Sequence, residues 1–345
     1  MIYPTKSMKK IAIIIPNWNG QATLKKCIDS LLVQSLKNSV IVVDNGSTDQ
    51  SNKILSNYGD KITVLKQEKN LGFAGGVNVG LNYSLNENFD FIALFNNDAV
   101  ADQYWLEKLL KQINTDEKIG IVTSKILTSN GHKIDSTGDF YTIWGLPYPR
   151  GRGEVNSEKY DSELSIFSAS GGACLFRSSM LKKIGLFDES FFAYYEDVDI
   201  SFRAQLFGFK VLYTPQALVY HQIGATSRKL KGFTTYQTMK NLPMLLLKNT
   251  PFPLLFKILP RFLLVYLSFF VSATSRKELS FALKGFWKSL LLLPKTLAKR
   301  KYNIKHKTVT DLYIKSILVY DLPPNATKLR AVRNIYRKIM RRKYV

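Results

Sequence analysis

An aspartate follows a strongly apolar segment at the point where a buried strand would end. Residues 89–95 are apolar at six of seven positions, and residues 96–98 after them read Asn-Asn-Asp. A carboxylate at the end of a buried strand, flanked by amides, is suited to hold a hard divalent cation that also binds phosphate oxygens. An Asx turn that leaves the strand explains the same residues, so both interpretations of Asp98 stay open on this pattern alone.

Asp44 ends a second apolar run in the same way and begins the polar segment 44–51. Much of that segment is typical of turns and helix caps, with Asp49 or Ser51 as the capping residue. Asp44 itself is placed to accept an N–H from a ligand ring.

Three glycines in the segment 70–78 let backbone N–H groups at a helix start approach an anion. Close packing of that helix on a sheet explains the glycines nearly as well.

The segment 194–203 holds three acidic residues within four positions at the expected start of a helix. Acidic residues favour helix N-termini because of the helix dipole. Asp199 and Arg203 are four residues apart and can form an ion pair along one helix face. Asp197 has Ser201 at the corresponding position and points about 160° away from Asp199 on a helix. It is therefore free to face a cleft as a general base.

His221 has the setting most suited to a ligand among the three histidines of the chain. It follows the apolar stretch 217–220, where a third ligand for a metal ion on Asp98 would be useful. A lone histidine is more often structural, so that alternative stays open. Cys27 and Cys174 lack a histidine or acidic partner at a useful spacing, which favours a core position for both. Two cysteines also exclude a disulfide framework.

The elements that position these residues follow an alternating α/β pattern from residue 11 to about residue 127. Continuous apolar runs alternate with amphipathic stretches, which is typical of a mostly parallel sheet covered by helices on both faces. Ligands bind beyond the carboxyl ends of such strands, where the polar segments lie. The expected strands are Ile11–Ile15, Val40–Val43, Ile62–Leu65, Phe89–Phe95 and Ile119–Lys125, and the expected helices are Ala22–Gln34, Ser51–Tyr58, Ala74–Leu85 and Gln103–Ile113. Residues 128–165 have little periodicity and indicate irregular loops, with short strands as the alternative.

Length and charge divide the chain into two parts. A chain of 345 residues predicts about two structural units, and 46% hydrophobic with 22% charged residues excludes disordered, collagen-like and coiled-coil proteins. Residues 1–227 hold 23 basic and 23 acidic side chains, whereas residues 228–345 hold 26 basic and three acidic ones. The whole net charge of +23 therefore lies in the second part. We expect a neutral domain at 1–227 and a basic, largely helical region at 228–345.

The basic region has the composition of a membrane-associating segment. Residues 251–275 are its longest apolar stretch. Lys257, Pro260 and Arg261 interrupt this stretch and leave 14 uncharged residues, fewer than the ~20 that a spanning helix needs. We therefore expect a shallow or interfacial segment. The next segment, 277–295, carries a lysine stripe with apolar residues opposite. The lysines are Lys277, Lys284, Lys288 and Lys295, and the apolar residues are Leu279, Phe286, Leu290 and Leu293.

A basic stripe of this kind favours binding to an anionic membrane surface, where each nearby Lys or Arg contributes about 1 kcal/mol. A helix packed on its own domain with solvated lysines is the alternative.

The region has no nucleic-acid-binding motif, so we expect no nucleic-acid partner. The apolar run Ile11–Ile15 is too short for a signal-peptide core. We expect a cytoplasmic protein, peripheral on the inner face of the cell membrane.

Together these segments resemble the inverting family-two nucleotide-sugar glycosyltransferases, in the branch that includes rhamnosyltransferases of bacterial polysaccharide assembly. The motifs follow the family order across about residues 9–227. Each is weak alone, but the ordered set is highly specific. The residues that carry the resemblance are segments 14–20, 42–49, 70–76, 96–98, 171–173, 185–189 and 196–199, and His221.

The resemblance implies a GT-A fold that binds a nucleoside diphosphate sugar at the strand ends. Asp44 would contact the base, and Pro16 and Asn17 would line the nucleoside pocket. The expected donor-binding residues are Pro16, Asn17, Asp44, Asn70, Gly75 and Asn97.

The resemblance also implies a metal ligand and a base. Asp98 matches the last acid of the Asp-x-Asp metal motif, whose first position is Asn96 here. Asp98 would then be the only carboxylate ligand of a Mg²⁺ or Mn²⁺ ion, which makes help from His221 more plausible. Asp197 matches the general base. The Gln-x-x-Arg-Trp signature of processive synthases is absent, so we expect one sugar to be transferred per encounter.

The expected activity is inverting, metal-dependent hexosyl transfer in cell-surface polysaccharide synthesis. dTDP-L-rhamnose is the expected donor, and galactofuranosyl or other hexosyl donors are alternatives. The expected acceptor is a glycan or a polyprenyl-diphosphate-linked saccharide, whose diphosphate would suit the basic region. Two alternatives belong to other classes: a catalytically silent module that binds sugar nucleotides or membranes, and a dinucleotide oxidoreductase. The second is disfavoured because no Gly-x-Gly-x-x-Gly follows the first expected strand.

Overall fold

The structure is a computed structural model that describes residues 9–162, 164–222 and 230–322. A nine-stranded mixed sheet forms the centre of this part of the protein. Two further short strands pair with each other beside it. The strands are β1 (Ile11–Asn17), β2 (Ser39–Asn45), β3 (Thr63–Gln67), β4 (Phe91–Phe95), β5 (Ala99–Ala101), β6 (Ile119–Thr128), β7 (Ile134–Ser136), β8 (Asp139–Tyr141), β9 (Pro147–Pro149), β10 (Ala173–Arg177) and β11 (Lys210–His221).

The strand order of the sheet is β3-β2-β1-β4-β10-β6-β11-β5, and β7 pairs with β6. β1, β2, β3 and β4 are parallel to one another, as the continuous apolar runs predict. β10 is antiparallel to both β4 and β6, and β11 returns parallel to β6. The carboxyl ends of β1, β2 and β4 therefore meet at one edge, so the polar segments after them converge.

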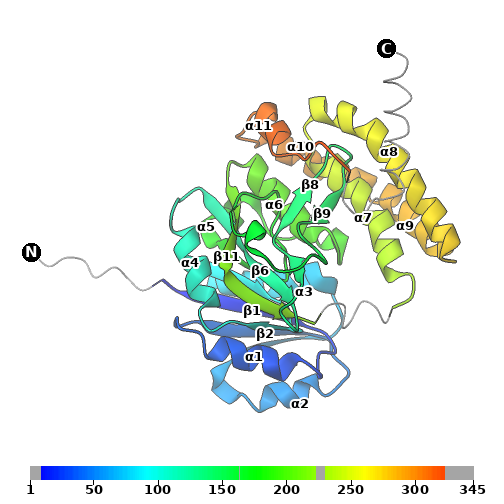
Figure 1. The fold of residues 1–345 in the computed structure, drawn as a ribbon. Coiled ribbons are helices and arrows are strands. Elements are labelled where there is room, and N and C mark those ends of the chain that lie inside the picture. Colours follow the sequence, from blue (N-terminus) through cyan, green and yellow to red (C-terminus); the bar gives the residue numbers. More distant parts are fainter. Residues whose placement is uncertain (1–8, 163, 223–229, 323–345) are drawn as a thin grey trace, which may run out of the picture.

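Helices cover both faces of the sheet, with α1 and α2 on one side and the C-terminal helices beyond the other (Figure 1). The helices of the first part are α1 (Leu24–Leu32), α2 (Ser51–Ser56), α3 (Gly72–Asn86), α4 (Trp105–Ile113), α5 (Ser178–Ile184) and α6 (Glu196–Leu206), with the short 3-10 turns η1 (Gly59–Lys61), η2 (Glu158–Tyr160) and η3 (Glu189–Phe191). The helices of the basic region are α7 (Phe233–Asn249), α8 (Phe252–Ser275), α9 (Leu279–Leu291), α10 (Leu293–Lys305) and α11 (Asp311–Ser316).

Alternate residues of β1 explain why the strand is apolar throughout. Ile13 and Ile15 pack in one core with α1 and α4. Ala12 and Ile14 pack in a second core with α3 and α6. Because successive strand residues point to opposite faces, a sheet covered on both sides needs apolar residues at every position. Both cysteines are buried and unbridged in these cores, as expected.

The basic helices share the second core with the first part of the chain. Met239, Leu242 and Leu245 of α7 belong to the same buried cluster as α3 and α6. The expected boundary after residue 227 lies outside the described residues, and the division into two domains stays a prediction. The structure shows that α7 and α8 pack through apolar side chains on the sheet half of the molecule, which we define as the described residues before 227.

The segment 251–275 forms one continuous helix, α8, of 24 residues. Pro260 lies inside this helix, so the residues at 257–261 that interrupt the apolar stretch do not interrupt the helix. By length and composition α8 can cross a membrane, with a mean hydropathy of 1.9 over its most apolar window. One side of α8 is nevertheless buried in the protein. On that side the Tyr266 hydroxyl donates to the Met239 carbonyl of α7 at 2.6 Å.

Candidate active site

A cavity of about 620 Å³ opens where the carboxyl ends of β1 and β4 meet. Its walls come from the segments after these strands, the segment before β10, the start of α6 and the start of α7. Seven of the nine predicted site residues line it, although they are separated by up to 205 positions along the chain. These residues are Pro16, Asn17, Asn70, Asn97, Asp98, Asp197 and His221.

A chain of amide hydrogen bonds joins the ends of β1, β2 and β4. The Asn17 side-chain amide donates to Asp44 Oδ1 at 3.1 Å, and Asn97 donates to Asn17 Oδ1 at 2.8 Å. Gly20 allows this approach, because an added Cβ there would lie 2.2 Å from Asn17 Oδ1 and 2.3 Å from Asn97 Nδ2. The chain fixes the orientation of the two asparagine side chains that face the cavity.

Asp44 and Gly75 lie behind the cavity wall. Asp44 is buried and supports Asn17. Gly75 is buried within α3, where an added Cβ would contact the Leu71 side chain. Their assignment to the donor site stays a prediction. In this structure Asp44 contacts the cavity-lining Asn17, and Gly75 lies against Leu71.

Asp98 and His221 meet because β5 pairs with the end of β11. His221 Nε2 lies 2.8 Å from Asp98 Oδ1, and His221 Nδ1 lies 2.8 Å from Asp135 Oδ2. Burial alone would lower the pKa of His221, but the hydrogen bonds to the two carboxylates outweigh it and raise that pKa to about 9. Arg152 completes the group, with Nε 3.1 Å from Asp135 Oδ1.

The pair of Asp98 and His221 fits a divalent cation that is held mainly by a diphosphate. At neutral pH the raised pKa keeps both ring nitrogens of His221 protonated, and Nε2–H donates to Asp98. A cation that displaced the Nε2 proton would meet a ring that Asp135 orients through Nδ1–H, as carboxylates orient other metal-ligating histidines. A magnesium-type ion that shares its remaining positions with phosphate oxygens and water needs few protein ligands. Within the described ranges, no cluster of three or more His, Cys, Asp or Glu side chains is arranged to hold a metal by itself.

Asp197 faces the same cavity from the first turn of α6. Its Oδ2 accepts from the Gly171 N–H at 3.0 Å, and its Oδ1 accepts from the Val198 N–H at 2.8 Å. Burial raises the pKa of Asp197, and these hydrogen bonds partly offset the increase. Asp199, in contrast, is fully buried, and Arg203 Nε lies 3.0 Å from its Oδ2, which confirms the predicted ion pair.

Two further carboxyl groups surround Asp197. Burial and the Asp197 charge raise the pKa of Asp139 to about 8, and the same two causes raise the pKa of Glu196. Glu196 lines the cavity, and its Oε2 has no hydrogen-bond partner among the described residues. The pKa of about 8 favours the neutral form of Asp139 at neutral pH, and burial shifts the pKa of Glu196 in the same direction. Asp197 accepts two backbone N–H bonds, which stabilise its charged form, so it is the group of the three best suited to carry charge into the cavity.

Residues 12–185 match the family model described as glycosyl transferase family 2. The chain belongs to this family. An uncharacterized glycosyltransferase of Rickettsia typhi is 32% identical over 198 residues, which cover 56% of this chain and 58% of that protein. A low-salt glycan biosynthesis hexosyltransferase of Haloferax volcanii is 27% identical over 201 residues, or 56% of this chain and 61% of that protein. The chain thus spans somewhat more than half the length of these relatives.

Solved structures show the GT-A type α/β fold, with helices around a curled mixed sheet. TarS residues 1–349 of S. aureus, in complex with UDP, superpose with a TM-score of 0.55 at 20% identity, over 91% of this chain and 94% of TarS 1–349. A mannosyltransferase of Pyrobaculum calidifontis, in complex with GDP-Man and Mn²⁺, gives a TM-score of 0.52 at 14% identity, over 87% of this chain and 86% of that chain. Because the two matches cover 91% and 87% of this chain, both include helices of the C-terminal region.

The family 2 motifs did not identify Asp135, Asp139 or Arg152. All three lie between residues 128 and 165, which lack periodicity and suggested loops. In the structure this segment forms the short strands β7, β8 and β9, of which β7 pairs with β6 and β8 pairs with β9. Three charged residues in a segment with little periodicity were the only signal in the sequence, and such residues are also typical of solvated loops.

The strap, residues 191–195, leads from η3 into α6 and the Asp197 carboxylate. Three of its residues have left-handed backbones without being glycine: φ is +62° at Phe192, +67° at Tyr194 and +71° at Tyr195. Each such residue costs of order ~1–3 kcal/mol and persists only where its surroundings hold it. The strap is therefore a strained segment directly before the candidate base.

Asn241 of α7 holds the strap from the basic region. Its side-chain amide lies 3.0 Å from the Phe191 carbonyl oxygen, 2.8 Å from that of Ala193 and 2.8 Å from that of Tyr194. Lys240 Nζ adds a bond to the Phe191 carbonyl at 3.1 Å. The strap that precedes the first turn of α6 is thus fixed by a helix that lies outside the family-matched residues.

We expect Asn241→Leu to lower kcat by about ten- to a hundredfold, or ~1.4–2.7 kcal/mol of activation free energy. Leucine keeps the volume but donates no hydrogen bond, so the strained strap is free to relax and to move Asp197. Donor binding, measured by calorimetry, should stay within about twofold, because the hydrogen bonds that orient Asn17 and Asn97 do not involve the strap. Asn86→Leu, at an exposed end of α3, is the matched control. A folded Asn241→Leu protein with wild-type kcat would contradict this role.

Proposed function

We propose that this family 2 protein is an inverting, non-processive hexosyltransferase that moves one sugar from a nucleoside diphosphate to an acceptor hydroxyl. The observation that supports it is the presence of Asp98 and Asp197 in the lining of one cavity of about 620 Å³, a volume typical of ligand sites. One carboxylate stands at the end of a strand, suited to the diphosphate side, and the other stands on a helix, suited to the acceptor side.

The residues of the chain supply binding and proton transfer. Asn17 and Asn97 orient the nucleotide, with Asp44 behind them, and Asp98 and His221 would hold a Mg²⁺ or Mn²⁺ ion. Such an ion would supply Lewis-acid stabilisation of the charge on the departing diphosphate. Asp197 accepts the proton of the acceptor hydroxyl as its oxygen bonds to the anomeric carbon from the opposite face. A single displacement with one base inverts the configuration at that carbon.

The proposed donor is dTDP-L-rhamnose, and galactofuranosyl and other hexosyl donors are the alternatives. The nucleotide part is supported by TarS, which binds UDP and in a further structure UDP-GlcNAc, and by the mannosyltransferase with GDP-Man. The polysaccharide part is supported by relatives that include the O-antigen biosynthesis protein RfbC of Myxococcus xanthus, 28% identical over 239 residues. The acceptor we propose is a glycan or a polyprenyl-diphosphate-linked saccharide at the inner face of the cell membrane.

A thermal-shift screen of nucleoside diphosphate sugars, with and without Mn²⁺, tests the donor and the metal together. We expect one donor to raise Tm, because a ligand at 100 times its Kd stabilises the folded state by ~2.7 kcal/mol. Asp98→Asn should lose the Mn²⁺-dependent part of the shift, and the exposed Asp60→Asn should keep it. If no nucleotide sugar shifts Tm in either condition, the donor assignment is wrong. If Asp98→Asn retains the full Mn²⁺ effect, the ligand assignment is wrong.

A further inference from the structure

Helix α8 exposes a continuous apolar stripe along its length. The residues 256, 263, 267 and 271 repeat at spacings of seven and four, so they lie on one helix face. The exposed fractions rise as high as 65% at Phe256 and 72% at Val271. The exposed apolar side chains of α8 are Phe252, Phe256, Leu263, Leu264, Leu267 and Val271.

Helix α9 carries a second stripe of the same kind. Trp287 is 62% exposed and Leu291 is 75% exposed. Phe286, which the sequence placed on this apolar face, instead packs partly against the core beside Phe270. The exposed stripe is therefore rotated from the expected one, and its members are Leu279, Leu283, Trp287, Leu290 and Leu291.

Basic side chains flank both stripes. Lys257 and Arg261 are exposed beside the α8 stripe, and Lys284 and Lys288 are exposed beside the α9 stripe. Neither helix contains an aspartate or glutamate within its bounds. Long basic side chains beside an apolar ridge can extend their charged ends to a polar surface while their stems stay apolar.

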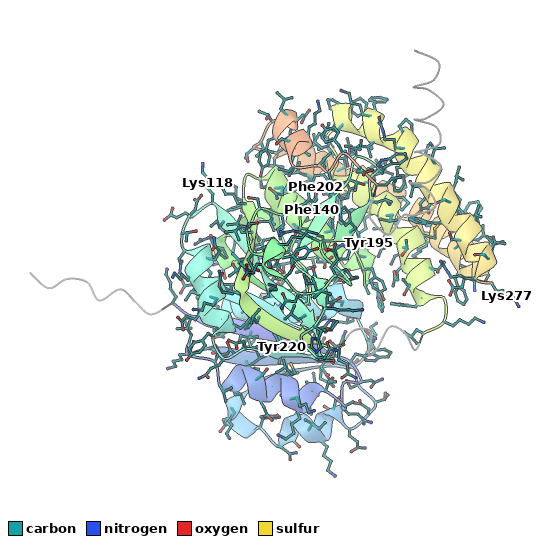
Figure 2. All side chains as sticks on the ribbon, in the orientation of Figure 1. Lys118, Phe140, Tyr195, Phe202, Tyr220 and Lys277 are labelled. Atoms are coloured by element: carbon teal, nitrogen blue, oxygen red, sulfur yellow. The ribbon has the colours of Figure 1, made fainter. Side chains whose placement is uncertain are left out.

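The α8 stripe ends, and the α9 stripe begins, close to residues that line the candidate active site. The turn between α8 and α9 contacts the first turn of α7, where the Thr235 hydroxyl donates to Glu278. Gly232 lies against Phe281, since an added Cβ would be 2.3 Å from its ring. The next residue, Phe233, lines the cavity. Helices α8 and α9 form the outer edge of the molecule, and Lys277 points away from its body (Figures 1 and 2).

We propose that the exposed faces of α8 and α9 rest on the surface of an anionic lipid bilayer and hold the cavity mouth next to it. The proposal deepens the proposed function, because it names the surface from which an acceptor would enter. A surface position, without a span, follows from the opposite side of α8, where Ile258, Phe262 and Val265 are buried in the protein core. A helix that crossed the bilayer would have to leave that core.

Charge selects the lipid surface over a second copy of the chain. Two copies that met through these stripes would bring together lysine and arginine edges without an acidic residue from α8 or α9 to neutralise them. Anionic headgroups supply that charge, and acyl chains cover the apolar ridge. The surface therefore fits a bilayer that contains phosphatidylglycerol or a similar acidic lipid.

Co-sedimentation of the full chain with vesicles tests the proposal. We expect binding to mixed phosphatidylcholine–phosphatidylglycerol vesicles, weaker binding in high salt, and little binding to pure phosphatidylcholine. The double variant Leu267→Gln/Trp287→Gln should lose at least about tenfold in vesicle affinity. Its matched control, Val33→Gln/Val155→Gln, removes two similarly exposed apolar residues elsewhere and should bind as the wild type does. Lys284→Gln/Lys288→Gln should weaken binding to anionic vesicles alone, whereas Lys53→Gln/Lys111→Gln should not.

The remaining outcomes separate this surface from its alternatives. A blue shift of tryptophan fluorescence on vesicle addition, lost in Trp287→Phe, supports insertion of α9. Equal binding by the α8–α9 variants and the wild type would overturn the proposal, and so would a stable dimer in light scattering that Leu267→Gln/Trp287→Gln dissolves. Donor-induced thermal shifts without vesicles report on the proposed function separately. A protein that binds its donor but no anionic vesicle refutes only the bilayer surface.

Discussion

Asp197→Asn is expected to lower the rate of sugar transfer by about 10³-fold, or ~4 kcal/mol of activation free energy. The amide has the size of the carboxylate but cannot take a proton from the acceptor hydroxyl. The substitution leaves the amide chain of Asn17 and Asn97 untouched, so the donor Kd should stay within about threefold. The loss should therefore lie in kcat, which distinguishes a catalytic base from a residue that binds the donor.

The pH profile gives a second readout for the same group. In the proposed mechanism transfer requires the Asp197 carboxylate, and burial raises its pKa. The activity of the wild type should therefore fall on acidification at a pH above the ordinary aspartate value of about 3.9. The residual activity of Asp197→Asn should lack this acid limb, and Glu68→Gln, at an exposed position, should keep it. An Asp197→Asn enzyme with near wild-type kcat would show that another group accepts the proton.

Much of the sheet half could be predicted because its strands are buried on both faces. The apolar runs fixed the positions of β1, β2, β3 and β4 to within a few residues, and the rule that ligands bind at strand ends brought Asp98 to the edge where Asn17 lies. Helix geometry and the four-residue spacing from Asp199 to Arg203 predicted different roles for Asp197 and Asp199. These arguments use short spacings, which a sequence shows directly.

The contacts that could not be predicted join residues far apart in the chain. Asp135 meets His221 across 86 positions, and Asn241 reaches the strap from 47 to 50 positions away. β11 was hidden because its register shifts between Thr214 and Leu218 interrupt the apolar pattern. The charge difference at residue 227 suggested a separate appendage, but charge composition does not report which basic side chains are buried.

Lys248 shows how far the basic region is built into the rest of the protein. Its Nζ lies 2.8 Å from Asp188 Oδ2 and 2.9 Å from Asp199 Oδ2, and the side chain is 3% exposed. Lys299 adds a second ion pair to Asp188. These lysines belong to α7 and α10, whereas both carboxylates precede residue 227. The buried acids of the sheet half are thus neutralised in part by the C-terminal helices.

Lys248→Met is accordingly expected to destabilise the protein by ~3–5 kcal/mol, the usual cost of leaving buried charges without their partner. Urea unfolding at neutral pH measures it, and Lys305→Met, exposed at the end of α10, is the control. The lysines lower the pKa of Asp188 despite its burial. The stability from Asp188 is therefore complete above its unfolded pKa of about 3.9 and is lost as pH falls toward the folded value.

The difference in stability between the wild type and Lys248→Met should accordingly shrink in acid. A chain that ends before α7 would lose Lys248 and Lys299 together, so we expect it to unfold. Unchanged unfolding of Lys248→Met would instead mean that Lys299 and Arg203 suffice to neutralise the two carboxylates.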